Sequence, residues 1–407
     1  MQAFNPKVHL AFEPPKARHS FTELGLDRPK NTPDMCFTEP FPLFSPEGVR
    51  MIRRELLSKK VLDKHLTSWP RAPCIISGHE ETATWIREMW CHPAVRESVE
   101  TAFGLPLQIL GRRGEIGHCN VQLGAGGVEA VYQLGEEAAL DETDGTSVST
   151  KEKAEQADSQ GVESAYDDVL TDAWHRDSTQ VVVVVMLSDA TTMEGGETAI
   201  RDGSGHVLKA RGAQAGSAVL MQGAHTWHAA LRATGGAHER ISMVTSWHFR
   251  DADLDDSGTS LRSIRSDEPM AACIQDHFFA HKLRKLRDRI DVQLDRLEAR
   301  RVVPAEDPDR PLLGRAVVEE WVGNQLGLLT QTAWELCERC PRWLYQDVPP
   351  AVMADYGCRL VVDSTKDATS SRLPIVSRVF SPDWDIGFLA GLFAGISVAL
   401  LSARSVR

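Results

Sequence analysis

Residues 174–187, WHRDSTQVVVVVML, place a histidine and an aspartate two residues apart, directly before a run of five valines. β-Branched residues favour strands, and a run this apolar is typical of a buried strand. Beside such a strand the pair His175 and Asp177 has three interpretations: a chance occurrence, a structural hydrogen bond, or two of the three protein ligands of a metal site.

Short runs of β-branched residues recur around this stretch, separated by Gly, Asp and Ser, as in a β-sandwich or barrel. They lie at 107–123, 180–187, 206–212, 217–223 and 239–249. Helical apolar spacing flanks them, at 49–66, 81–89 and 93–103 before the strands and in two long amphipathic segments after Pro269. The sequence therefore predicts an α+β fold, with helices on both sides of a β core.

We expect the chain to be organised in consecutive parts. These are an extended N-terminal segment at 1–45, N-terminal helices at 46–105, the β core at 106–252, a helical region at 269–380 and a candidate C-terminal membrane helix at 386–403. Ser45 followed by Pro46 is a good start for the first of these helices.

An acidic segment at 135–168 interrupts the β core. It holds eleven acidic residues and two lysines, so it carries −9 of the net charge of −12. With almost no large apolar residue it cannot offset its ordering entropy by burial, and we expect a disordered surface insertion. Because it ends shortly before His175, it is either a lid over the site or a solvated loop without a catalytic purpose.

The remaining charge and the cysteines exclude several classes of partner and site. The rest of the chain is nearly neutral and has no basic track, so we expect no nucleic acid. Residues 1–20 lack the apolar core of a secretory signal, which predicts a cytoplasmic protein. Only Cys337 and Cys340 form a CxxC pair, and no second pair exists for structural zinc, so the cysteines are interpreted as free thiols. The alternating charges of the helices after Pro269 indicate solvated surfaces.

A second histidine and an arginine follow the valine run in an order that suits a metal centre. Residues 217–249 offer a strand, His228, a loop, and Arg240 at the start of another strand. Two imidazoles and one carboxylate fill one face of an octahedral ferrous ion and leave three positions for a bidentate cosubstrate and oxygen. Three histidines with a water would instead suit catalytic zinc. His225 competes with His228 for the third position, and we favour His228, which precedes the small apolar run AAL.

Arg240 and Ser242 lie two residues apart on one predicted strand and therefore share a face. A guanidinium that grips a carboxylate through two parallel bonds suits the distal end of a dicarboxylate keto acid, and the serine hydroxyl adds a donor. The alternative for Arg240 is a surface ion pair with Glu239. His118 and Asn120 lie on a predicted strand that could face the pocket, and a core position is the alternative for His118.

Several motifs resemble the double-stranded β-helix (jelly-roll) core of the Fe(II)/2-oxoglutarate-dependent oxygenases, and in wording they most resemble filamentous-fungal members. They are WHRDS at 174–178, GGET at 195–198, RGAQAGSAVLMQG at 211–223, HAALRATGGAHERISMVTS at 228–246, EIGHCNVQLG at 115–124 and RLPIVSRVFS at 372–381. The resemblance covers most of residues 20–380, and the acidic insertion and the extreme C-terminus depart from it.

The resemblance implies that His175, Asp177 and His228 hold Fe(II), and that Arg240 with Ser242 binds the distal carboxylate of 2-oxoglutarate. The implied enzyme is a dioxygenase that uses O2, with ascorbate as a candidate cofactor. It would oxidise a small-molecule substrate, by hydroxylation, desaturation or cyclisation, and release succinate and CO2. Two rivals stay open: a non-catalytic scaffold of the same fold that binds a partner through its C-terminal helices, and a cupin-like metalloenzyme that uses no keto acid. The extra helices would also suit a homodimer.

The last part of the chain differs in composition from the rest. Residues 386–403 carry no charge and as a helix would span roughly 27 Å, close to the hydrocarbon thickness of a bilayer. Gly387, Gly391 and Gly395 recur at the spacing by which membrane helices meet. We expect a transmembrane helix that anchors a cytoplasmic catalytic domain to an intracellular membrane. The alternative is a buried terminal helix, which the moderate hydrophobicity of the stretch favours.

Overall fold

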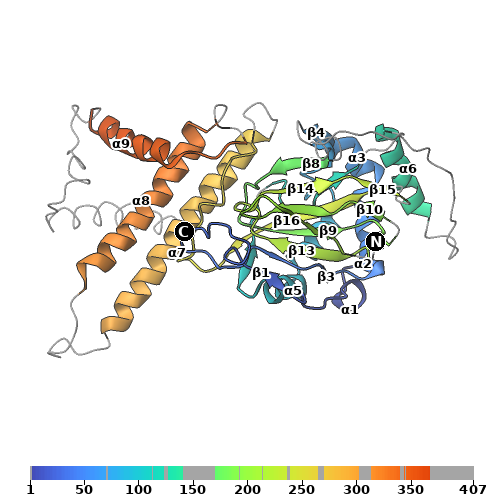
Figure 1. Ribbon diagram of the computed structural model, residues 1–407, viewed down its shortest axis with the longest axis horizontal. Coiled ribbons are helices and arrows are strands. Elements are labelled where there is room, and N and C mark those ends of the chain that lie inside the picture. The colour runs from blue at the N-terminus through green and yellow to red at the C-terminus, as the bar shows by residue number, and fades with distance from the viewer. Residues whose placement is uncertain are drawn as a thin grey trace. The chain divides into compact units, whose positions relative to one another are not determined.

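The computed structural model describes residues 2–69, 72–111, 113–122, 127–140, 170–191, 193–212, 214–235, 239–264, 270–301, 313–339, 343 and 345–366. The chain divides into two compact units, Met1–Gln346 and Asp347–Arg407. The first unit holds every described strand and all but the last of the described helices (Figure 1). Its sheets are antiparallel, so the predicted mixture of helices and sheets is confirmed.

The larger sheet contains ten of the described strands. They are β1 (Arg18–His19), β2 (Phe37–Thr38), β3 (Phe41–Pro42), β4 (Leu66–Trp69), β5 (Ala72–Ile76), β6 (Leu107–Ile109), β7 (His118–Val121), β9 (Val181–Met186), β13 (Ser217–Met221) and β16 (Ile241–Phe249). Their order is β1-β2-β13-β9-β16-β7-β5-β4, with β3 also beside β13 and β6 beside β16.

The valine run forms β9, at the centre of this sheet between β13 and β16. Val181, Val183 and Val185 pack into the main hydrophobic core, whereas Val182 and Val184 pack into a second cluster. Because successive side chains of a strand point to opposite faces, an unbroken apolar run suits a strand that has a core on each side.

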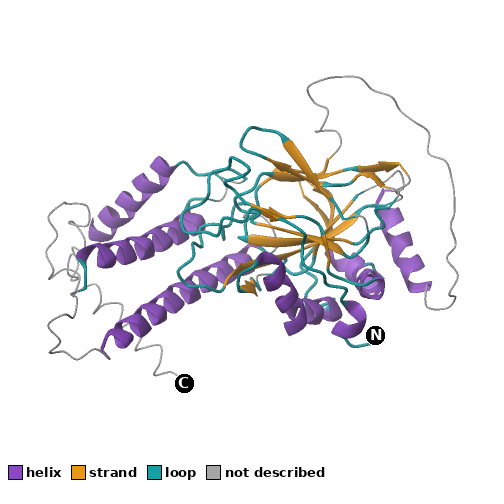
Figure 2. Ribbon diagram, turned by 60° about the horizontal axis from the view of Figure 1, so that its bottom comes forward, coloured by secondary structure: helices purple, strands orange, loops and turns teal. Residues whose placement is uncertain are grey.

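The smaller sheet lies against one face of the larger sheet. Its strands are β12 (Val207–Ala210), β11 (Thr198–Arg201), β14 (His228–Leu231) and β8 (Leu170–His175), in that order, and β10 (Met193–Gly195) pairs separately with β15 (Ala233–Gly235). Ile200 and Ala210 of the smaller sheet pack against Val182 and Val219 of the larger one. The two sheets therefore face each other across a shared apolar layer, and Figure 2 shows their strands gathered together.

Helices cover the other face of the larger sheet. They are α1 (Pro6–His9), α2 (Pro46–Leu56), α3 (Lys59–His65), α4 (Thr84–Cys91), α5 (Pro93–Phe103) and α6 (Gly127–Leu140). Ser45 caps α2 as expected, since its Oγ accepts a hydrogen bond from the Gly48 amide at 3.0 Å. Ile52 of α2, Trp90 of α4 and Val99 of α5 are fully buried in the main core.

Two of the predicted boundaries differ from the structure. The expected single helix at 49–66 is two helices, α2 and α3, because the chain leaves the helical conformation at Leu57 and restarts at Ser58, the N-cap of α3. The acidic segment begins inside α6, so the prediction of disorder is wrong for residues 135–140. Residues 141–168 of that segment lie outside the described residues.

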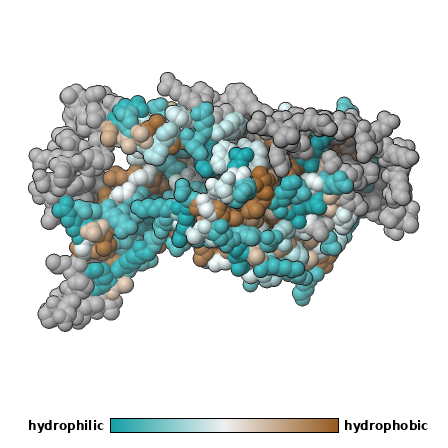
Figure 3. All heavy atoms as spheres, in the orientation of Figure 1, coloured by the Kyte–Doolittle hydropathy of each residue, from teal (hydrophilic) through white to brown (hydrophobic). Residues whose placement is uncertain are grey.

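Two long helices follow the strands, α7 (Ala271–Arg301) and α8 (Arg315–Cys337). The predicted solvation of their charged faces is wrong for one face of α7, where Lys282, Lys285 and Arg289 are buried. Elsewhere the two helices expose apolar side chains, such as Phe279 of α7 and Leu329 of α8. Figure 3 shows apolar residues among hydrophilic ones over this part of the first unit. One face of α7 therefore buries three cationic residues, which the alternation of charges along the sequence does not reveal.

The last described helix, α9 (Pro350–Lys366), belongs to the second unit. The predicted transmembrane helix is corrected here, because no helix among the described residues is long and apolar enough to cross a membrane. The segment that prompted it, 386–403, lies outside those residues. The described cysteines, Cys337 included, are free thiols.

Candidate metal centre

Two strands of the smaller sheet bring His175 and His228 together. His175 ends β8, His228 begins β14, and the two residues are direct partners in the antiparallel register. Their ring centroids lie 4.3 Å apart, and both residues are buried. Directly opposed residues share a face of a sheet, so both imidazoles point to the same side.

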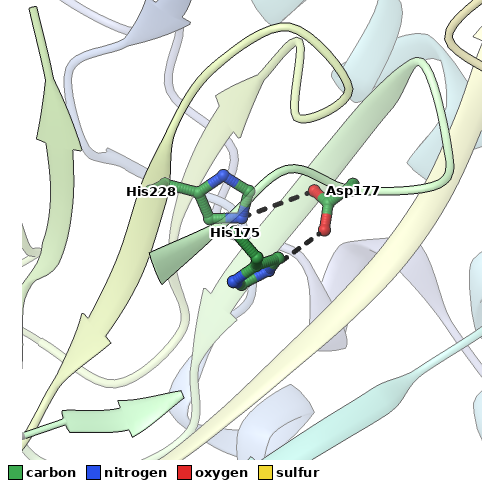
Figure 4. Close-up of side chains that lie close together, drawn as sticks. All are labelled: His175, Asp177 and His228. Carbon is green, nitrogen blue, oxygen red and sulfur yellow. Dashed lines mark ion pairs between the residues drawn. The ribbon is translucent and has the colours of Figure 1, made fainter. Parts of the chain in front are cut away.

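Asp177 completes the group from the turn after β8. Its Oδ1 lies 3.3 Å from Nε2 of His175, and its Oδ2 lies 3.5 Å from Nε2 of His228 (Figure 4). One ligating atom from each of the three residues lies within 4.8 Å of the others. Among the described residues this is the group of histidine, cysteine and acidic side chains whose geometry suits a metal ion.

Backbone carbonyls fix the orientation of both imidazoles. Nδ1 of His175 donates to the carbonyl of Ala173 at 2.6 Å, and Nδ1 of His228 donates to the carbonyl of Thr226 at 2.9 Å. With the proton held on Nδ1, each Nε2 presents a lone pair towards Asp177, as a metal ligand requires. Burial lowers the pKa of His228 below its usual value, which favours the neutral imidazole that binds metals.

A missing side chain makes room for the carboxylate. The amide of Asp177 donates to the carbonyl of Gly223 at 3.0 Å, and a Cβ atom at Gly223 would stand only 1.9 Å from Oδ2 of Asp177. The φ of Gly223 lies outside the left-handed range, so space alone requires glycine here. Gly223 lies within one of the motifs that resemble the oxygenase core, but its residue type alone did not indicate a role in the site.

The two histidines considered for the third position differ in where they lie. His228 lies in the group with His175 and Asp177, whereas His225 lies outside it, in the turn before β14. His225 instead approaches the loop after β16, where a Cβ on Gly258 would lie 3.2 Å from its Nε2. His118, at the start of β7, also lies outside the group.

Arg240 comes from the larger sheet, immediately before β16, and is 1% exposed. Its Nε donates to the carbonyl of Gly196 at 3.0 Å, and its Nη1 donates to Oγ of Ser242 at 3.1 Å, so the predicted shared face of Arg240 and Ser242 is confirmed. Burial lowers the pKa of Arg240 to about 10, with Asp172 and Glu197 opposing the change. The guanidinium stays charged at neutral pH.

The alternative of an ion pair between Arg240 and Glu239 is excluded. Glu239 pairs with Arg53 of α2, whose Nη2 lies 3.0 Å from its Oε2. The salt bridges found within 4.0 Å among the described residues include none of Arg240, although the carboxylates of Asp172 and Glu197 favour its charged form. A buried guanidinium without an ion pair is a favourable site for the carboxylate of a ligand.

A series of contacts between polar residues connects Ser242 with His175. Asn120 of β7 is the register partner of Ser242, and its Nδ2 donates to Oδ2 of Asp172 at 3.3 Å. Asp172 lies on β8, and its Oδ1 is 3.8 Å from Nδ1 of His175. Sequence reasoning noted Asn120 but missed Asp172, because residues three apart on a regular strand point to opposite faces. An irregularity in the pairing of β8 with β14, between His175 and Asp172, changes that alternation.

Comparisons with known proteins give no family assignment, since neither a family model nor a curated protein matches the chain. Similar solved structures include the non-heme alpha ketoglutarate dependent epimerase SnoN from nogalamycin biosynthesis, at 12% identity and a TM-score of 0.31 over 52% of this chain and 77% of that one. Another is a Pseudomonas putida prolyl-4-hydroxylase, at 13% identity and 0.27, over 50% and 88%. A third, from Burkholderia pseudomallei, is an oxidoreductase of the 2OG-Fe(II) oxygenase family, at 13% identity and 0.27, over 46% and 74%. At these TM-scores the similarities carry no argument, and they give the fungal resemblance no support.

Proposed function

We propose that this chain is an Fe(II)/2-oxoglutarate-dependent dioxygenase whose two facing sheets form a double-stranded β-helix. The observation that carries the proposal is the convergence of two imidazoles and one carboxylate, together with a buried arginine that forms no ion pair among the described residues. Either feature alone has simpler explanations. Together they match the needs of a metal that binds a dicarboxylate keto acid.

The donor set fits ferrous iron. His175, Asp177 and His228 would occupy one face of an octahedral ion and leave the opposite face for cosubstrate and oxygen. When bound, Fe(II) would supply the oxidation chemistry that couples decarboxylation of 2-oxoglutarate to oxidation of the substrate. The protein contributes ligands that are already oriented by the carbonyls of Ala173 and Thr226.

Arg240 and Ser242 would hold the far end of 2-oxoglutarate. The guanidinium is fixed by its bond to the Gly196 carbonyl, which leaves donors for a carboxylate, and the Ser242 hydroxyl lies beside it. A charge-assisted pair in a buried site is stronger than one in water. These two residues would therefore orient the keto acid so that its other end reaches the metal.

We further propose a small-molecule substrate that is hydroxylated, desaturated or cyclised, with release of succinate and CO2. The rival scaffold function predicts partner binding without turnover. The cupin-like rival predicts metal binding without consumption of a keto acid.

Oxygen-dependent formation of succinate from 2-oxoglutarate by the iron-loaded protein tests the proposal. We expect His175→Ala to abolish it and His225→Ala, a matched histidine outside the metal group, to retain it. Absence of succinate in the natural protein with every substrate pool tried, despite bound iron, would leave the cupin-like function. Absence of metal binding would leave the scaffold.

A further inference from the structure

The residues after Asp177 are buried although they are polar. Ser178, Thr179 and Gln180 are each at most 4% exposed, in the turn between the metal ligand and β9. Buried polar groups need hydrogen-bond partners, so other residues must cover this turn and form hydrogen bonds with its polar groups. Part of this comes from β16, where Oγ of Ser246 accepts from Thr179 and the Phe249 amide donates to Gln180, each at 3.1 Å. The partners of Ser178 and a further partner of Gln180 come from the segment after β16, residues 251–264, which we term the bracing loop.

The bracing loop binds Ser178 through three hydrogen bonds. The hydroxyls of Ser178 and Ser263 lie 2.6 Å apart, the Ser263 amide donates to Oγ of Ser178 at 3.0 Å, and the Ser260 amide donates to its carbonyl at 2.9 Å. Gln180 also donates to the carbonyl of Asp255. The residue next to the metal-binding carboxylate is therefore held at both its side chain and its backbone.

The same loop packs against the turn that supports Asp177 from the other side. A Cβ on Gly258 would lie 2.9 Å from Cβ of Ala224, one residue after the glycine whose carbonyl accepts the Asp177 amide. Arg262 donates to the carbonyl of Ala224 at 3.4 Å. The bracing loop thus contacts both the turn that contains Asp177 and the turn at Gly223 that accepts the Asp177 amide.

The long helices in turn hold the bracing loop. From α8, the buried Glu335 accepts the Leu261 amide at 2.9 Å. From α7, Lys282 reaches the carbonyl of Asp256 at 2.6 Å and its carboxylate at 2.7 Å. Leu261 and Ile264 of the loop share a hydrophobic cluster with Ile274 and Phe278 of α7, together with Leu336 of α8.

We propose that the bracing loop, held by α7 and α8, fixes the position of Asp177, so that Ser178 and Ser263 are positioning residues of the metal centre. The proposal rests on the metal-binding part of the proposed function. It assigns the C-terminal helices a role in metal affinity, beyond their contribution to stability. Removing the hydroxyl of Ser263 should let the Asp177 turn relax and weaken the metal site.

Binding of Mn(II) alone, with free ion counted by its electron paramagnetic resonance signal, tests this without turnover. We expect Ser263→Ala and Ser178→Ala each to weaken Mn(II) binding about tenfold, the lower end of the effect of losing a supporting group of a metal ligand. Ser263→Thr keeps the hydroxyl and should bind like the natural protein. Ser257→Ala, on the exposed part of the same loop, removes a hydroxyl that contacts only Asp255 among the described residues and should change nothing.

The possible results separate the two proposals. Equal Mn(II) affinity in the natural protein and in folded Ser263→Ala, with folding checked by circular dichroism and melting temperature, overturns the positioning role and leaves the oxygenase proposal intact. A tenfold loss in Ser263→Ala, together with a natural protein that makes no succinate, supports the positioning role and refutes the oxygenase. Equal losses of Mn(II) affinity in Ser263→Ala and Ser263→Thr would also refute the positioning role, because the hydroxyl of residue 263 would then be irrelevant.

Discussion

At the scale of single residues, the candidate metal centre depends on Gly223, a residue without a side chain. Gly223 gives its carbonyl to the Asp177 amide and its empty Cβ position to the Asp177 carboxylate. Both contacts are made with Asp177, so the residue at position 223 affects the backbone and the side chain of Asp177.

Gly223→Ala should displace the Asp177 carboxylate, since an atom 1.9 Å from Oδ2 cannot be accommodated without movement. We expect Mn(II) binding to weaken by at least about tenfold, as for other losses of ligand geometry. Gly323→Ala is the matched control, because its Cβ would meet open space on α8. Unchanged affinity in Gly223→Ala would show that the carboxylate does not bind the metal from this position.

Arg240 offers a second single-residue test. Arg240→Lys keeps the charge but replaces a planar fork by a point charge, which cannot serve the Gly196 carbonyl, the Ser242 hydroxyl and a carboxylate together. We expect the KM for 2-oxoglutarate to rise at least about tenfold, with a smaller effect on kcat. Arg53→Lys, which alters the neighbouring pair with Glu239, should leave that KM unchanged. A KM unaffected by Arg240→Lys would move the cosubstrate site elsewhere.

At the scale of elements, cationic side chains of α7 bind the bracing loop. Lys282 pairs with the fully buried carboxylate of Asp256, Lys285 donates to the carbonyl of Asp251 at 2.5 Å, and Arg289 donates to that of Ala252 at 2.9 Å. Their spacing of three and four residues puts them on one face of the helix. Charged groups thus take the place that apolar residues usually occupy at a helix interface.

Lys282→Met should destabilise the protein by about 3 kcal/mol, because it leaves a buried carboxylate without its main cation. His281, whose Nε2 lies 3.0 Å from the same carboxylate, compensates in part. Urea unfolding measures the effect. The exposed Arg284→Met on the same helix should change the free energy of unfolding by less than about 0.5 kcal/mol. Equal effects of the two substitutions would contradict a role for the buried pair.

At the scale of the whole molecule, sequence reasoning located the strands better than their arrangement. The valine run and the strands holding Ser242 and Ala218 were predictable from local composition. The pairing of β7 with β16 joins residues more than 100 positions apart, and in the smaller sheet β8 pairs with β14 across more than 50 positions. Local propensity carries no information about such pairings.

The candidate site shows the same division. His175, Asp177 and His228 were predictable from residue type and order, and Arg240 with Ser242 from strand periodicity. Gly223 was not, because the need for an empty Cβ position arises only when two turns meet. The cationic face of α7 was missed because exposed and buried lysines look alike in a helix that alternates charges.

The stability of the first unit should fall with acidification in a window set by two buried histidines. Burial lowers the pKa of His79 and of His248 to about 4. Since both titrate near 6.5 when unfolded, the unfolded chain binds more protons between about pH 6.5 and 4, and the free energy of unfolding falls as the pH drops through that window. Each histidine contributes about 1.4 kcal/mol per pH unit.

Urea unfolding at pH 7.0 and at pH 5.0 measures this slope. His248→Gln should reduce the loss of stability between the two values, because one of the groups no longer takes up a proton. His206→Gln, at a side chain that is 80% exposed, should reproduce the natural slope. If His248→Gln lost as much stability between pH 7.0 and pH 5.0 as the natural protein, His248 would not be buried in its neutral form.

The N-terminal segment, although rich in proline, supplies the outermost partners of the larger sheet. Phe37 of β2 pairs with Met221, and Phe41 of β3 pairs with Ala218, so β13 is bonded along both of its sides. A fragment starting at residue 46 would carry β13 as an open backbone edge, able to recruit the same edge of another molecule. By pairing with β13, the first 45 residues thus also reduce the tendency of the folded protein to self-associate.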